Sequence, residues 1–254
     1  MTAVAAPPAL AVRGATKRFG AVLALDGVDL EVRRGQVLAI LGDNGAGKST
    51  LIKCISGVHR LDDGRIEMDG RPVTIHSPAE ARSLGIETVY QDLALFDNLG
   101  PAANFYAGRE LAGPRWLPTW FRFLDRREMA GKTRELLETL QVGLPDMSSQ
   151  VGLLSGGQRQ AVAVARAAAF ASNVVILDEP TAALGLRESR HVLDLISRLR
   201  EADHAVIVIS HALDHVIEIA DRAVVLRRGR KVGEEVPNRD SQQRIVSLIV
   251  GGEG

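Results

Sequence analysis

The sequence has 254 residues, of which 46% are hydrophobic, enough for one sizeable core or for a core with a small satellite subdomain. Lysine plus arginine and aspartate plus glutamate each number 31, so the net charge is zero and gives no bulk electrostatic reason to bind nucleic acid. The one cysteine, Cys54, excludes an internal disulfide framework and a cysteine-based zinc cluster.

Residues 1–9 lack the basic start and the longer apolar stretch of a signal peptide, and we expect them to form a flexible leader. No segment approaches the roughly 20 apolar residues that span a bilayer. We therefore expect a cytoplasmic protein, which another component would anchor if it works at a membrane.

Residues 10–41 are predicted to be rich in β-structure, with strands at 10–13 and 28–32 on either side of a turn. Phe19 stands out because only 4% of the chain is aromatic. Its ring would either stack on a nucleotide base or fill the β-layer as a hydrophobic plug.

Residues 36–41 form an apolar run, residues 42–50 read GDNGAGKST, and residues 51–56 are helix-like. A strand, a glycine-rich turn and a helix in this order are the context of a phosphate-binding loop. Glycines let backbone N–H groups converge on phosphates, and the helix N-terminus adds its positive dipole end. The predicted nucleotide-binding residues are Gly42, Asn44, Gly45, Ala46, Gly47, Lys48, Ser49 and Thr50.

Gln91 lies at the end of a predicted strand, 86–90, and residues 92–150 then change character. Eight of the ten aromatic residues fall between Tyr90 and Phe123, and residues 125–140 have the pattern of a helix. We expect a helical insertion with its own small core. Its aromatic residues would form that core or carry a surface for a partner.

Three later segments have polar groups at the ends of predicted elements. Ser155 and two glycines precede an alanine-rich helix predicted over 161–170, so this helix start is a second candidate anion site. The apolar strand 174–179 ends in Asp178 and Glu179, and strand 205–209 is followed by His211. In a parallel sheet, such carboxyl ends form the ligand-binding edge.

The C-terminal part of the sequence predicts a hairpin and a short helix. Residues 224–232 are expected to form a hairpin with a solvated basic turn, and residues 245–250 a docking helix.

In this order the motifs resemble those of the ATP-binding cassette family, over residues 10–250. The resemblance identifies Phe19 as the A-loop aromatic, residues 42–50 as Walker A, Gln91 as the Q-loop, Asp178 and Glu179 as Walker B, and His211 as the switch histidine. The signature motif that separates this family from other P-loop proteins is Leu154 followed by Ser155, Gly156, Gly157 and Gln158.

The family pattern implies an α/β fold: a P-loop NTPase (RecA-like) core with an antiparallel β-subdomain and an inserted α-helical signature subdomain. The expected division is 10–91 and 161–238 for the β-subdomain and core, 92–160 for the helical subdomain, and 239–254 for a C-terminal helix and tail.

The resemblance also implies the chemistry, which is hydrolysis of ATP with Mg²⁺. Phe19 would stack on adenine, and Ser49 and Asp178 would bind the metal. Gln91 would contact the metal or the attacking water, as a metal-binding and catalytic residue, and would couple the site to the transporter. Glu179 would polarise the water and His211 would hold the γ-phosphate as the other catalytic residues. In a head-to-tail dimer, the signature residues Ser155, Gly156, Gly157 and Gln158 would bind the ATP of the other subunit.

The sequences of residues 89–95, 179–185 and 249–251 resemble those of ATP-binding subunits of bacterial monosaccharide importers in their single-cassette form. The expected partners are a second such subunit, transmembrane permease subunits and, indirectly, a periplasmic sugar-binding protein. The expected location is the cytoplasmic face of the inner membrane. Gly185 departs from the family pattern, which has aspartate there, and this puts strict coupling between the two sites of a dimer in doubt.

Two other functions compete with sugar import. A soluble cassette ATPase could act on nucleic acid or ribosomes, but such relatives usually have paired cassettes, coiled coils or zinc modules, which this sequence lacks. A metabolite kinase would have no use for the signature motif or the switch histidine.

Overall fold

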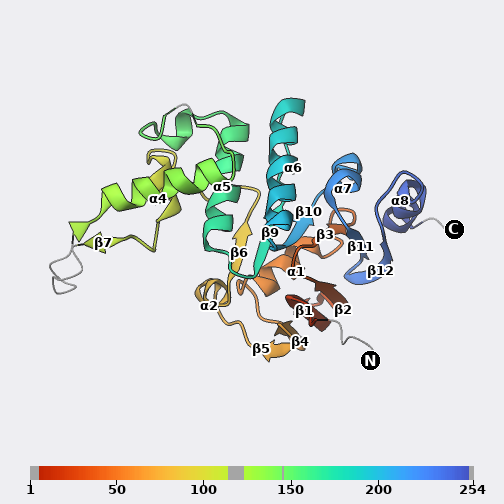
Figure 1. Cartoon of the computed structure of the whole chain (residues 1–254). Helices are drawn as coiled ribbons and strands as arrows, with labels where there is room; N and C mark the ends of the chain where they lie inside the picture. The colour runs from red at the N-terminus through yellow and green to blue at the C-terminus, as the bar shows by residue number, and fades with distance from the viewer. Residues whose placement is uncertain (1–5, 114–122, 145, 252–254) are drawn as a thin grey trace, which may run out of the picture.

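The computed structural model describes residues 6–113, 123–144 and 146–251, and it contains a four-stranded sheet, a six-stranded sheet and a small two-stranded sheet. Figure 1 shows the four-stranded sheet below the six-stranded one, with helices α4, α5 and α6 above. The fold is mixed α/β, as the sequence predicts.

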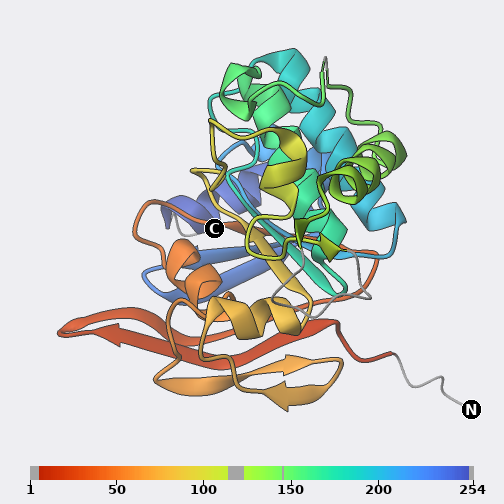
Figure 2. The same cartoon turned by 90° about the vertical axis from the view of Figure 1, so that its left-hand side faces the viewer.

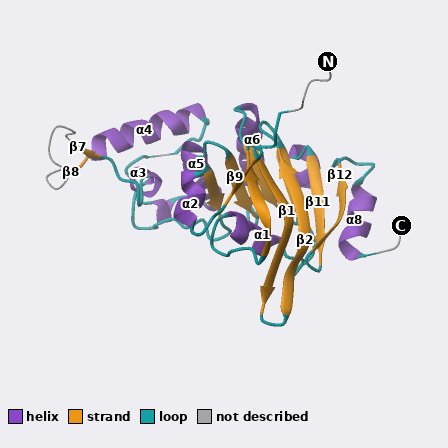
Figure 3. Ribbon diagram, turned by 90° about the horizontal axis from the view of Figure 1, so that it is seen from below, coloured by secondary structure: helices purple, strands orange, loops and turns teal. Residues whose placement is uncertain are grey.

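The N-terminal half of the chain supplies the antiparallel four-stranded sheet, in the order β2-β1-β4-β5. Its strands are β1 (Leu10–Phe19), β2 (Val22–Val32), β4 (Asp63–Met68) and β5 (Arg71–Val73). The first two strands are longer than the sequence predicts, because they continue through register shifts that absorb the expected turn region. The turn lies instead between Phe19 and Val22, at the tip of a long hairpin (Figure 3).

The six-stranded sheet has the order β12-β11-β3-β10-β9-β6. Its strands are β3 (Val37–Leu41), β6 (Ile86–Val89), β9 (Val174–Asp178), β10 (Ala205–Ile209), β11 (Arg222–Arg227) and β12 (Arg230–Glu235). All neighbours are parallel except β11 and β12, which form the predicted basic hairpin. The central strands β3, β9 and β10 are almost entirely apolar because both faces of the sheet are covered.

Alternate residues of these strands point to opposite faces, so the sheet serves two cores. Ile40, Ile176 and Ile207 face the four-stranded sheet and the first helix, α1 (Lys48–Ile55). Val175, Leu177 and Val206 face the helices on the other side. Figure 2 shows α1 and α2 (Pro78–Ser83) between the two sheets.

The covering helices on the other side are α3 (Pro101–Phe105), α4 (Arg126–Thr139), α5 (Gly156–Phe170) and α6 (Leu186–Glu201), with a 3₁₀ turn at Val151–Leu153. Phe105, Tyr106, Met129 and Leu137 are buried in the same cluster as Val175 of the sheet. The expectation of a separate small core in the insertion is therefore wrong. The insertion packs on α5, and α5 packs on the sheet, so one core is continuous through both.

The alanine-rich helix also begins earlier than predicted. Helix α5 starts at Gly156 with Ser155 as its N-cap, so both glycines of the signature motif lie in its first turn. Two short strands, β7 (Ala112–Gly113) and β8 (Phe123–Leu124), pair beside α4. Trp116, Trp120 and Phe121, which belong to the predicted aromatic surface, lie outside the described residues, as does most of the predicted leader.

The C-terminal elements cover the far end of the six-stranded sheet. Helix α7 (Leu213–Ile219) and helix α8 (Gln242–Val250) pack on β11 and β3 through Val216 and Ile245. This agrees with the predicted docking helix. Across the described ranges, no helix is both long and apolar enough to span a bilayer.

Asn104 holds together the loop that leads from the sheet into the insertion. Its side chain is fully buried. Its amide nitrogen donates to the carbonyl oxygens of Phe96, Leu99 and Gly100 at 3.1–3.2 Å, and its oxygen accepts from the Phe96 N–H at 2.7 Å. One side chain thus satisfies four backbone groups of an otherwise irregular segment.

Replacing Asn104 with alanine should lower the free energy of unfolding by about 2 kcal/mol, because buried backbone groups lose their partners. Thermal unfolding followed by circular dichroism would show this as a drop of several degrees in Tm. The matched control is Asn98→Ala, an exposed asparagine of the same loop, which should leave Tm almost unchanged. Equal Tm values for the two variants would contradict this role of Asn104.

Candidate functional site

The predicted site residues follow strands whose carboxyl ends meet at one edge of the six-stranded sheet. In the register, Ile209 of β10 pairs with Ile40 of β3 and with Asp178 of β9. Val89 of β6 pairs with Leu177 of β9. The loops after β3, β6, β9 and β10 therefore emerge side by side, as expected for a ligand-binding edge.

The loop after β3 has a backbone that a side chain would obstruct. Gly42 and Gly47 have φ values of 148° and 105°. A Cβ on Gly42 would lie 2.2 Å from the carbonyl oxygen of Leu226, and a Cβ on Gly47 would lie 2.7 Å from that of Ala24. The loop is thus pressed against β11 and β2, and the absence of side chains leaves its inner surface to backbone groups.

Helix α1 begins where this loop ends. Its N-cap is Gly47, and among the described residues no side chain caps it and no acid occupies its first turn. Its first N–H groups and its dipole are therefore available to an anion in front of the helix. Ser49 and Thr50, in this first turn, also line the cavity described below.

Lys48 is held in the loop by the loop's own backbone. Its Nζ donates to the carbonyl oxygens of Gly42 at 2.7 Å and Asp43 at 3.1 Å, and the residue is 7% exposed. Burial lowers the pKa of Lys48, while the nearby carboxylates of Glu179 and Asp178 act to raise it. A buried ammonium group with two carbonyl partners is a strong position for binding phosphate oxygens.

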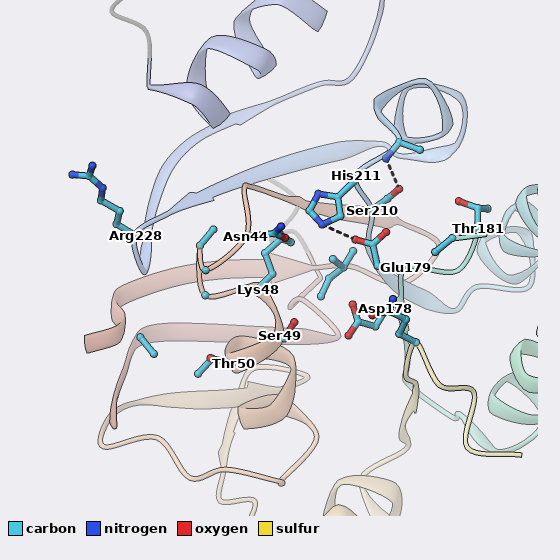
Figure 4. A pocket seen from close by; sticks show the side chains of 18 of the residues that line it. Asn44, Lys48, Ser49, Thr50, Asp178, Glu179, Thr181, Ser210, His211 and Arg228 are labelled. Atoms are coloured by element: carbon cyan, nitrogen blue, oxygen red, sulfur yellow. Dashed lines mark hydrogen bonds and ion pairs between the residues drawn. The ribbon is translucent and has the colours of Figure 1, made fainter. Parts of the chain in front are cut away.

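Asp178 and Glu179 lie at the end of β9, opposite Lys48. Burial raises the pKa of both carboxyl groups, and Lys48 opposes the shift at Asp178. Oε1 of Glu179 lies 3.0 Å from Nε2 of His211, which follows β10. The same oxygen is buried, and its contact with the imidazole lacks the geometry of a hydrogen bond. Figure 4 shows Glu179 and His211 in contact with each other, on the opposite side of the cavity from Lys48 and Asn44.

These groups surround a cavity of about 910 Å³. Gln91, which follows β6, lies in its wall together with residues of the loop after β3 and the ends of β9 and β10. The predicted site residues in the wall are Asn44, Gly45, Ala46, Gly47, Lys48, Ser49, Thr50, Gln91, Asp178, Glu179 and His211. Gly42 lies at the base of the loop, against Leu226.

Phe19 is not among the residues that line the cavity, where the neighbouring Val22, Leu23 and Ala24 lie. Its ring is 43% exposed and meets the His59 ring edge-on, with centroids 5.1 Å apart. The structure therefore places Phe19 at the tip of the β1–β2 hairpin. Its ring does not fill the β-layer as a hydrophobic plug.

The signature residues are also outside this cavity. Ser155 and Gln158 form a capping box: the Ser155 Oγ accepts from the Gln158 N–H at 3.2 Å, and the Gln158 Oε1 accepts from the Ser155 N–H at 2.9 Å. Ser155, Gly157 and Gln158 line a separate cavity of about 390 Å³ beside α6. Within one chain, the phosphate-binding loop and the signature residues therefore line two separate cavities.

Helix α6 begins at Gly185, the position that departs from the family pattern. Gly185 is its N-cap and carries no side-chain capping bond. A Cβ at this position would lie 2.6 Å from the Glu188 Oε2, which is the mobile end of a side chain. A side chain at position 185 would therefore meet no backbone atom, and crowding does not require a glycine there.

Sequence reasoning missed several residues that the fold brings to the site. Thr181 lines the cavity, and its Oγ1 lies 2.9 Å from the Nδ1 of His215 on α7. Arg228, from the basic turn that was expected to be merely solvated, lies at the cavity edge. The next residue, Gly229, donates its N–H to the Ala46 carbonyl at 3.0 Å. Only the nearness of Thr181 to Glu179 in the sequence could have indicated one of these residues.

The residues present fit a nucleoside triphosphate with a magnesium ion. The glycine cradle and the uncapped α1 N-terminus suit phosphates. The Ser49 hydroxyl, the Gln91 amide and the Asp178 carboxylate are the oxygen donors that Mg²⁺ prefers. No cluster of three His, Cys, Asp or Glu residues in the described part of the chain could hold a metal alone. Magnesium fits this pattern because it usually keeps waters and phosphate oxygens as ligands.

Comparisons with known proteins agree with this geometry. The ABC transporter family profile matches residues 25–182. The chain is 47% identical over 251 residues to the fructose import ATP-binding protein FrcA of Rhizobium meliloti, covering 98% of this chain and 96% of that protein. It is also 47% identical to the ribose import ATP-binding protein RbsA 1 of Rubrobacter xylanophilus, covering 96% of this chain but 47% of that protein.

Solved structures show the same fold. A nucleotide-free ATP-binding cassette from an ABC transporter superposes with a TM-score of 0.80 at 27% identity, covering 96% of this chain and 97% of that one. The relatives in sugar import disfavour the alternative of an ATPase that acts on nucleic acid. The chain belongs to the ABC transporter family, and it has the fold of an ATP-binding cassette.

Proposed function

We propose that this chain is the ATP-hydrolysing subunit that powers import of a simple sugar through a membrane permease. The observation that carries the proposal is the convergence of Lys48, Asp178, Glu179 and His211 on one cavity in front of the α1 N-terminus. The strong similarity to a fructose import ATP-binding protein over nearly the whole length supports the sugar as cargo.

ATP would be bound mainly through its phosphates. The loop N–H groups between Gly45 and Thr50 and the Lys48 ammonium would hold the β- and γ-phosphates. Ser49, Asp178 and Gln91 would hold Mg²⁺, which supplies charge neutralisation on the phosphate oxygens. Phe19 would stack on adenine after a movement of the hairpin tip, since its exposed ring is available to a ligand.

Glu179 is the best candidate to orient and polarise the attacking water. Its Oε1 is buried and lies 3.0 Å from Nε2 of the His211 imidazole. A water that hydrogen-bonds to this oxygen would be positioned for in-line attack on the γ-phosphate. His211 would then stabilise the charge on the phosphate, and Gln91 would help to place the water.

The second half of the site would come from another subunit, most simply a second copy of this chain. Ser155, Gly156, Gly157 and Gln158 lie away from the cavity of their own chain, at the start of α5. The capping box uses the Gln158 N–H and would leave the N–H groups of Gly156 and Gly157 to an anion. In a head-to-tail dimer they would donate hydrogen bonds to the γ-phosphate bound by the partner.

The remaining partners follow from the same proposal. Permease subunits would bind the aromatic insertion that follows Gln91, in which Phe96 is 54% exposed and Phe123 is 74% exposed. A periplasmic sugar-binding protein would deliver the sugar to the permease. The chain would work at the cytoplasmic face of the inner membrane, and it would have no direct contact with the sugar.

Lys48→Ala should weaken ATP binding by at least about tenfold, because a charge-assisted contact to phosphate is lost. Equilibrium titration with a fluorescent ATP analogue measures the effect. Lys53→Ala, an exposed lysine on the same helix, is the matched control and should retain affinity. Unchanged affinity in Lys48→Ala would contradict the phosphate cradle.

Glu179→Gln should retain ATP binding but lower turnover by about 100-fold or more, since the amide cannot polarise water as a carboxylate does. Phosphate release measures turnover, and uptake of labelled fructose, ribose or xylose by cells that depend on the variant measures import. Glu201→Gln, an exposed glutamate on α6, is the control. Normal turnover in Glu179→Gln would refute its role, whereas turnover loss with normal sugar uptake would refute sugar import.

The acid side of the pH profile offers a further test. Burial raises the pKa of Glu179 and Asp178, so these groups become protonated at a higher pH than ordinary carboxyl groups. Because the reaction needs them ionised, kcat/KM should fall as pH is lowered, with a midpoint above the ordinary glutamate value of 4.5. An acid midpoint at or below that value would show that Glu179 does not control the reaction.

A further inference from the structure

Arg166 on α5 holds the segment that follows Gln91. Its Nη1 donates to the carbonyl oxygen of Ala94 at 2.8 Å, and its Nη2 donates to that of Leu93 at 3.0 Å. The two bonds come from one planar guanidinium group and reach two successive carbonyls. Such a fork fixes both the position and the direction of the segment.

The segment has a conformation that needs this support. Leu93 and Ala94 have φ values of 60° and 46°, which place two consecutive non-glycine residues in the left-handed region. L-residues disfavour this region, and it persists where the surroundings determine it. The Leu93 N–H donates to the Tyr90 carbonyl at 2.9 Å, so the turn encloses Gln91 itself.

Arg166 has two charged neighbours, of which Glu87 attracts it and Arg109 repels it. Glu87, on β6, lies near Arg166 and accepts a bond from Arg109 Nη1 at 2.9 Å. The Arg109 guanidinium lies over the Phe170 ring, 4.1 Å from its centre. Arg109 thus pairs with the largely buried Glu87, which also attracts Arg166, and the group joins β6, the segment after α3 and helix α5.

We propose that Arg166 is a positioning residue that fixes Gln91 by clamping the Leu93–Ala94 turn to α5. The proposal rests on the function proposed above, in which Gln91 helps to place water and metal. Because Ser155 caps the same helix, the clamp also ties the Gln91 segment to the signature motif about 15 Å further along the helix. A displacement of one would then be transmitted to the other through a single rigid element.

The test compares Arg166→Lys with the unaltered chain. Lysine keeps the charge but has one ammonium in place of the fork, so it cannot hold both carbonyls. Hydrogen–deuterium exchange of the amides of residues 90–96 should accelerate by about tenfold, with the central strands unchanged. At saturating ATP, kcat should fall by about tenfold while the KM for ATP changes by less than about twofold.

Two further variants separate positioning from a general structural effect. Arg222→Lys is the matched control, since Arg222 donates to the Glu31 carbonyl at 3.3 Å, away from Gln91 and from the signature residues. It should match Arg166→Lys in Tm but leave kcat unchanged. If Arg166 acts through Gln91, the double variant Gln91→Ala with Arg166→Lys should be no slower than Gln91→Ala alone.

The outcomes are decisive in both directions. Unchanged exchange at 90–96, equal kcat losses in the two arginine variants, or multiplicative losses in the double variant would each overturn the proposal. If Gln91→Ala alone has normal kcat, action through Gln91 is refuted while ATP hydrolysis by the chain stands. Absence of ATP turnover in the unaltered chain and in all variants would instead refute the proposed function. Hydrogen–deuterium exchange at residues 90–96 would then still decide whether Arg166 clamps the turn.

Discussion

The parallel register of β3, β10, β9 and β6 is the constraint on which the site depends. Strands β3, β9 and β10 are apolar runs with a polar group where each run ends, and β6, which carries Glu87 and Thr88, is followed by Gln91. Because Ile209 is level with both Ile40 and Asp178, these ends are aligned to within a residue. A slip of one residue in any strand would turn its side chains to the wrong face, so burial of the two cores also fixes the catalytic edge.

The electrostatics of that edge follow from the same burial. A lysine and two carboxyl groups are placed together where water is partly excluded, and burial opposes the charge on each of them. The attraction between Lys48 and the two carboxylates offsets part of this cost. A phosphate chain with a cation would add the missing partners, so ligand binding would stabilise an arrangement that the fold alone leaves incompletely satisfied.

Much of this site could be predicted from the sequence, because Lys48, Asp178 and His211 each follow a strand that hydrophobicity alone identifies. Short-range patterns also predicted the β11–β12 hairpin and the Ser155 cap. The contacts of His215 with Thr181, the left-handed turn at Leu93 and the Gly229 contact with the phosphate loop depend on elements distant in sequence. The same holds for the position of Phe19, because the shape of a long hairpin depends on its register shifts.

The strand order also divides the chain by local stability. Strand β3, which leads into the phosphate loop, lies inside the sheet between β11 and β10 and can be exposed only when neighbouring strands separate. Strands β7 and β8 have two residues each, and Phe123 and Leu124 at their edge are exposed. The free energy of local opening should therefore be near the global value at the phosphate loop and small around β7 and β8. The end of the molecule with the candidate nucleotide site should resist local opening. The end with β7 and β8 should open without unfolding the rest.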